Sequence, residues 1–91
     1  MTNQTIKFHP GIILHDVIIG ALRSSGSSLD GWCQANQVRS TTARSVTLGT
    51  STGPKGTEML NKIIDDAGRD IVTAAYTKRM VMEAEKLKAV A

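Results

Sequence analysis

The chain has 91 residues and a mass of 9.7 kDa, which is enough for one small domain with one hydrophobic core. Hydrophobic residues make up 41% and charged residues 21%, with a formal net charge of +3, a balance typical of a globular rather than a disordered protein. The lack of a long apolar run excludes a membrane-spanning helix, and a single cysteine excludes an internal disulfide and a cysteine-based zinc site, so we expect a soluble, cytoplasmic protein.

The first predicted element is an amphipathic helix that starts around Pro10. Apolar residues recur at helical spacing, at Leu14, Val17, Ile18 and Ala21. We expect Pro10 in the first turn, where its missing N–H costs nothing, and His9 as a polar cap beside it. Residues 24–28 are small and polar with a central glycine, so they should break the chain and end on a new helix N-cap.

Two short helices joined by a turn are predicted within about residues 28–49. The first carries apolar residues at helical spacing, namely Leu29, Trp32 and Cys33. Val38 is a lone apolar residue in the turn. The second helix begins near residue 39 or 40, keeps Ala43 and Val46 inward, and ends before Gly49, a natural left-handed C-terminal residue. This spacing is that of a helix-turn-helix, whose second helix lies in the DNA major groove.

Two more helices are predicted after a loop over residues 50–56. The fourth starts near Pro54 or Thr57 and ends at Gly68, and its apolar residues are Leu60, Ile63, Ile64 and Ala67. Asp70 caps a fifth helix, over about residues 70–90, whose apolar stripe is Val72, Tyr76, Met80, Leu87 and Val90. Since that stripe exceeds what a monomer of this size needs, we expect this helix to mediate homodimerisation; the alternative is a frayed tail packed on the first helix. We therefore predict one compact all-α domain of five helices over residues 1–91.

The outward side of the second short helix carries the residues that we expect to bind DNA. All are hydrogen-bonding and none is acidic: Arg39, Ser40, Thr41, Thr42, Arg44, Ser45 and Thr47. No carboxylate occurs between Asp30 and Glu58, so this stretch does not repel phosphate. We expect four of them to read base edges: Arg39, Thr41, Thr42 and Arg44. We expect contacts with the phosphate groups of the DNA backbone from Ser40, Ser45, Thr47 and Lys55. The alternative is a solvated surface helix rich in Ser and Thr.

Residues 28–49 resemble the helix-turn-helix of λ-repressor-like regulators, most closely the small phage Ner-type repressors, in their Ser-Leu start, their Trp and their Ser/Thr-rich second helix. Residues 8–16 resemble the His-Pro-Gly start of antitoxins of the host-inhibition-of-growth type. The chain has Cys33 where Ala is usual, Gln37 where Gly is usual, and Ile12 where the antitoxins have Glu. Without that Gly, either Asn36 takes the left-handed conformation or the turn is reshaped. The resemblance implies sequence-specific binding of duplex DNA as a homodimer at an inverted repeat.

Three functional hypotheses follow from these patterns. The first is a transcriptional regulator, a phage- or prophage-type repressor acting on double-stranded DNA and associated with the nucleoid. The second is an antitoxin whose C-terminal helix binds a toxin protein and whose DNA binding regulates its own operon. The third is an architectural DNA protein without sequence preference. The scarcity of aromatic residues argues against a single-strand binding platform.

Other residues that can carry chemistry have a structural interpretation. His9 and His15 lack the further ligands that a zinc site needs. Cys33 is expected to be a small core residue rather than a redox-sensing thiol. The pair Asp65-Asp66 has no partner base or nucleophile and is predicted to be a solvated face. We therefore expect no enzymatic activity, no metal, no cofactor and no membrane partner.

Overall fold

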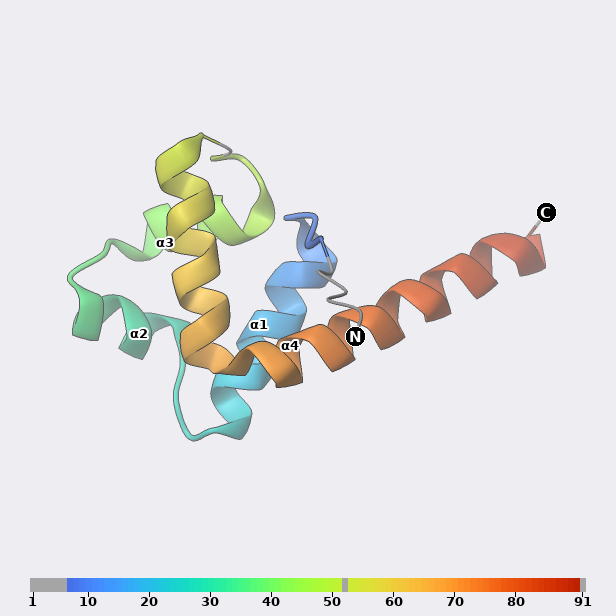
Figure 1. Cartoon of the computed structure of the whole chain (residues 1–91), viewed down its shortest axis with the longest axis horizontal. Coiled ribbons are helices and arrows are strands. Elements are labelled where there is room, and N and C mark those ends of the chain that lie inside the picture. The colour runs from blue at the N-terminus through green and yellow to red at the C-terminus, as the bar shows by residue number, and fades with distance from the viewer. Residues whose placement is uncertain (1–6, 52, 91) are drawn as a thin grey trace, which may run out of the picture.

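The computed structural model describes residues 7–51 and 53–90, and within them it contains helices and no strand. The elements are α1 (Ile12–Ser24), α2 (Leu29–Asn36), α3 (Ser40–Leu48) and α4 (Pro54–Val90) (Figure 1). The predicted all-α class is confirmed, whereas the predicted five helices are four, because the last two form one kinked element. In the described part of the chain, no helix has both the length and the apolar character needed to cross a membrane.

The start of α1 differs from the prediction, whereas its buried side agrees with it. Gly11, with extended backbone, is the N-cap, so Pro10 lies before the helix rather than in its first turn. No side chain caps this end, and the backbone N–H of His9 instead donates to the Tyr76 hydroxyl at 3.1 Å. The four predicted apolar residues of α1 are all buried. The N-terminal arm is therefore held by α4 rather than by a local cap.

The turn between α2 and α3 is closed by a left-handed residue that is not glycine. Ser28 caps α2 by accepting a hydrogen bond from the Gly31 N–H at 3.0 Å, as the sequence predicted. Gln37 itself takes the left-handed conformation, at φ 56° and ψ 44°, while Asn36 remains the last helical residue. Of the two alternatives expected for this turn, a left-handed Asn36 or a reshaped turn, the first is therefore wrong, since Gln37 itself closes the turn. Its side chain instead donates to the Trp32 carbonyl at 2.8 Å.

Gly68 bends α4 where the sequence predicted a helix end. At φ 104° and ψ 93° it is the one non-helical residue inside the element, and the helix resumes immediately, so the predicted cap Asp70 is not at a helix start. Across the bend, Arg69 pairs with Asp65, lowering the pKa of that carboxyl by their hydrogen bond, and donates to the Asn61 side chain at 3.1 Å. After the bend α4 runs past α1 and then projects away from the body of the domain (Figure 1).

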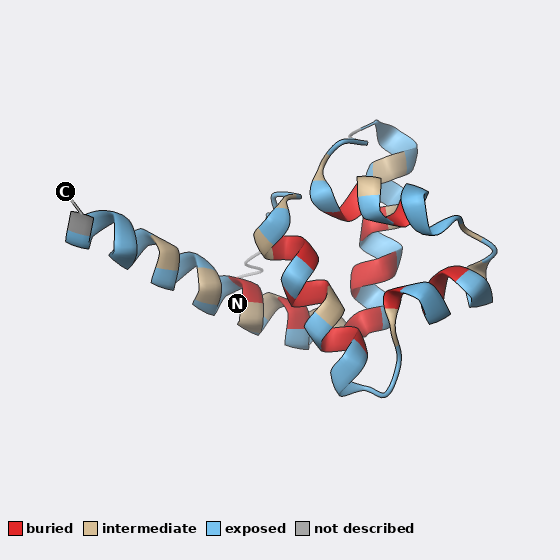
Figure 2. Cartoon of the chain, turned by 180° about the vertical axis from the view of Figure 1, so that it is seen from behind, coloured by how far each residue is buried: buried red, intermediate tan, exposed pale blue. Residues whose placement is uncertain are grey.

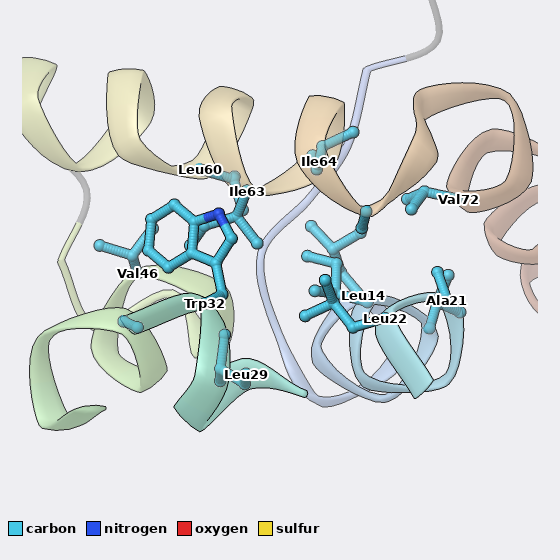
Figure 3. Close-up of a cluster of buried hydrophobic side chains, with 14 of the residues drawn as sticks. Leu14, Ala21, Leu22, Leu29, Trp32, Val46, Leu60, Ile63, Ile64 and Val72 are labelled. Atoms are coloured by element: carbon cyan, nitrogen blue, oxygen red, sulfur yellow. The ribbon is translucent and has the colours of Figure 1, made fainter. Parts of the chain in front are cut away.

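The hydrophobic core is assembled from all four helices, and Trp32 forms the end of it that lies beside Val46, Leu60 and Ile63 (Figure 3). The indole is 6% exposed, and its N–H donates to the Asp66 carboxylate at 2.8 Å, which ties α2 to α4. Asp66 was predicted to lie on a solvated face. It is exposed, but its carboxylate also binds the Trp32 indole. Val38 is half-buried against this core, as expected for the turn. Burying each large side chain contributes about 1.5–3 kcal/mol, so the core fixes the relative positions of the helices.

Candidate nucleic-acid interface

Helix α3 is held against the domain along one side and at its C-terminal end. Ala43 and Val46 are buried, as the sequence predicted. The Thr47 carbonyl accepts a hydrogen bond at 3.1 Å from the N–H of Gly11, at the start of α1. Gly49 ends α3 with a positive φ of 91°, also as predicted. These contacts fix the position of α3 on the domain, with its opposite side turned to solvent.

Thr47 is not part of the exposed face, so its predicted contact with phosphate is wrong. The residue is fully buried, at 0% exposure. Its Oγ1 lies 2.8 Å from Nδ1 of His15 and donates to the Arg44 carbonyl at 3.2 Å. With its one hydrogen directed at the Arg44 carbonyl, the hydroxyl accepts from His15 in the tautomer that carries the proton on Nδ1. Thr47 follows the buried Ala43 by four residues, which places it on the inward side whatever its polarity.

The other predicted residues of α3 do reach the surface. Five of them are exposed: Arg39, Ser40, Thr41, Thr42 and Arg44. Ser45 is half-buried, and its carbonyl accepts hydrogen bonds from the backbone N–H groups of residues 49–51. Sequence reasoning missed Leu48, which is 37% exposed and lies on the same line of the helix as Thr41 and Arg44. Leu48 follows Thr41 by seven residues and Arg44 by four, and this helical spacing could have indicated that it shares their face.

The N-terminus of α3 leaves its backbone N–H donors open. Arg39 is the N-cap residue, with φ −70° and ψ 141°, and no side chain accepts a hydrogen bond from the first turn. That turn also contains no acidic residue. The unpaired N–H groups and the positive end of the helix dipole therefore stand next to an arginine, an arrangement that favours an anion.

Two open hollows flank the turn, and Val38 lines both of them. The first, about 430 Å³, adjoins α3 and contains Asp30, Gln37 and Ser40. The second, about 440 Å³, is also lined by the predicted phosphate ligand Lys55 and by Lys62. Lys55 thus lies beside the α2–α3 turn rather than on the face of α3. Lys62 follows it by two helical turns and was not singled out from the sequence.

The buried titratable groups behind α3 are held in their neutral forms. Burial lowers the pKa of His15 below its ordinary value, and the nearby Arg44 charge acts in the same direction against the opposing effect of Asp16. Burial raises the pKa of the Cys33 thiol, with a smaller contribution from Asp30. Cys33 is therefore a protonated packing residue at neutral pH, consistent with its predicted role.

Comparison of the chain with protein-family models, with curated protein sequences and with solved structures gives no match. The candidate site is therefore defined by its own geometry: an exposed helical face without carboxylates, an uncapped helix N-terminus, and two lysines beside the turn.

Proposed function

We propose that the protein is a sequence-specific regulator of transcription that binds double-stranded DNA through a λ-repressor-like helix-turn-helix, as a phage- or prophage-type repressor. In this proposal α3 lies in the major groove and α2 braces it against the DNA backbone. The observation that carries the proposal is the outward face of α3, which is exposed, rich in hydrogen-bonding groups and free of carboxylates, on a helix whose opposite side is buried.

The arrangement of the exposed side chains supports separate roles for base and backbone contacts. Arg44 is central on the face and can donate two hydrogen bonds to a guanine, while its neighbour Leu48 can contact a thymine methyl group. Arg39, Thr41 and Thr42 are the further candidates for base edges. The open N–H groups of α3, together with Ser40 and Ser45, suit phosphate. Lys55 and Lys62 suit the backbone beside the turn.

Selection of binding sites from random duplexes, followed by gel-shift titration, tests this proposal. Arg44→Ala should cost about 1–3 kcal/mol on the selected site and relax the preference at one base pair. Lys55→Ala should weaken binding to all duplexes alike and reduce the dependence on salt. Lys78→Ala removes the same charge from the distant part of α4 and is the control, for which little change is expected. Equal losses on selected and scrambled duplexes for Arg44→Ala and Lys55→Ala contradict the assignment of roles.

The second candidate function is an antitoxin, and the observation that favours it is the projecting part of α4. Large apolar side chains are exposed there, as a surface for a protein partner requires. A small adjacent gene whose product is lethal alone and is neutralised by this chain supports this function. The third possibility, an architectural protein, requires equal affinity for any duplex.

A further inference from the structure

We propose that the projecting half of α4 pairs with the same segment of a second copy as a parallel two-stranded coiled coil. This inference rests on the proposed function, because it supplies the homodimer that an inverted repeat requires. The contact would run along the C-terminal seam, which we define as Thr77, Met80, Ala84 and Leu87. These residues follow one another at intervals of three, four and three, the spacing of a coiled-coil core.

The seam lies on a part of α4 that the domain does not cover. Tyr76 is the last buried residue of the described helix, and no later residue up to position 89 is buried (Figure 2). Along the seam, Met80 is 41% and Leu87 73% exposed, and the smaller Thr77 and Ala84 between them are exposed as well. The segment continues a helix that is anchored in the domain, but it buries no residue of its own, so a partner helix would supply the apolar burial that stabilises it.

The charges beside the seam are complementary to a second copy in the parallel orientation. Glu83 and Lys88 flank the seam on opposite sides and are five residues apart. In a parallel pair, that spacing places Glu83 of each chain opposite Lys88 of the other chain, so two attractive pairs form. In an antiparallel pair that keeps the same four seam residues in contact, Glu83 meets Glu83 of the other chain and Lys88 meets no glutamate, so neither attractive pair forms. The charges therefore select both the partner and the orientation.

The neighbouring residues hold Glu83 in place for this role. Its carboxylate accepts a hydrogen bond from Lys86 at 3.2 Å and lies 3.9 Å from the Arg79 guanidinium. A parallel pair is also symmetric about a two-fold axis, as is an inverted repeat. With only four core positions in each chain, we expect the free dimer to be weak and to be strengthened by binding of both copies to one DNA.

Cysteine cross-linking of the full chain tests the orientation. Thr77→Cys and Ala84→Cys should each form a disulfide-linked dimer on mild oxidation, because a parallel pair places identical core residues opposite each other. Met82→Cys is the control, since residue 82 lies on the side of the helix away from the seam. The native Cys33 is buried and remains in every variant. Cross-linking at only one of the two seam positions, or equally fast cross-linking at position 82, overturns the proposal.

A charge exchange, followed by sedimentation equilibrium without DNA, tests the pairing itself. Lys88→Glu and Glu83→Lys should each weaken self-association about tenfold, and mixing the two variants should restore it, since both cross-chain pairs are then attractive. Glu85→Lys, on the outward side, should have little effect. Far-ultraviolet circular dichroism checks that each variant keeps its helices. A wild-type chain that stays monomeric, or a mixture that associates no better than the single variants, refutes the pairing.

These experiments separate the failure of the seam from the failure of DNA binding. A chain that selects a specific duplex but does not self-associate through the seam retains the proposed function and overturns this inference. A chain that cross-links as expected but has equal affinity for every duplex retains the seam and overturns the proposed function.

Discussion

The buried hydroxyl of Thr47 supports the sharpest prediction on stability. Thr47→Val keeps the shape of the side chain and removes Oγ1, the hydrogen-bond partner of His15 Nδ1 at 2.8 Å. Nδ1 then has no partner in a buried site, and an unsatisfied polar atom of this kind costs about 1–3 kcal/mol. The Arg44 carbonyl also loses the hydroxyl as a donor. Against a total stability of about 5–15 kcal/mol for a small domain, this loss is large.

Urea unfolding of the matched variants Thr47→Val and Thr41→Val measures this effect. Thr41 is exposed on the same helix, so its substitution should change the free energy of unfolding by no more than about 0.5 kcal/mol. The order should reverse for DNA: Thr41→Val should weaken the selected complex, whereas folded Thr47→Val should bind nearly as well as the wild type. A Thr47→Val protein as stable as the wild type refutes the buried hydrogen bond as a stabilising contact.

Three further predictions concern the backbone of the motif and the pH dependence. Gln37→Gly should leave stability unchanged or raise it by up to about 1 kcal/mol, because glycine adopts the left-handed conformation without strain. An unfolding midpoint well below that of the wild type contradicts this prediction. Gly49→Ala should lower stability by about 1–3 kcal/mol, since φ is 91° and a Cβ would lie 3.0 Å from the Pro10 carbonyl oxygen; an unchanged thermal midpoint would exclude this strain. Burial lowers the pKa of His15, so the unfolded chain binds more protons than the folded chain below about pH 6.5. The stability that comes from keeping His15 neutral should therefore be fully present above about pH 6.5 and decrease as the pH falls toward the pKa of the folded state. Urea titrations of His15→Gln at several pH values should show a weaker decrease.

The limits of α2 and α3 follow from local signals. Ser28 is a strong N-cap, Gly49 is a natural helix end, and the apolar residues between them keep a helical period, so the sequence predicts both helices closely. Gln37 is left-handed although it is not glycine, because it closes a local helix cap in which the Val38 N–H donates to the Cys33 carbonyl at 2.9 Å and the Gln37 N–H to the Gln34 carbonyl at 3.4 Å. The sequence left two alternatives there, a left-handed Asn36 or a reshaped turn, because Asn adopts this conformation more readily than Gln.

The features that the sequence did not predict depend on contacts between distant segments. Asp66 accepts from Trp32 across 34 positions of the chain, and no local pattern indicates that pair. Thr47 faces inward with Ala43, but its side chain resembles those of the exposed residues around it, and its partner is 32 positions away in α1. Gly68 was predicted to end a helix. Its backbone is non-helical, as predicted, but the helix resumes directly after it, so the two predicted helices form one kinked element, and Arg69 contacts residues 61 and 65 across the bend.

The most direct test of the account is methylation protection of guanine N7 in a duplex selected by the protein. If α3 occupies the major groove in both copies of a dimer, guanines should be protected in two patches about one helical turn, or ~34 Å, apart. Arg44→Ala should lose the protection of one guanine in each patch while the rest persists. Protection that is absent from the major groove, or unchanged in Arg44→Ala, contradicts the claim that this face of α3 reads DNA.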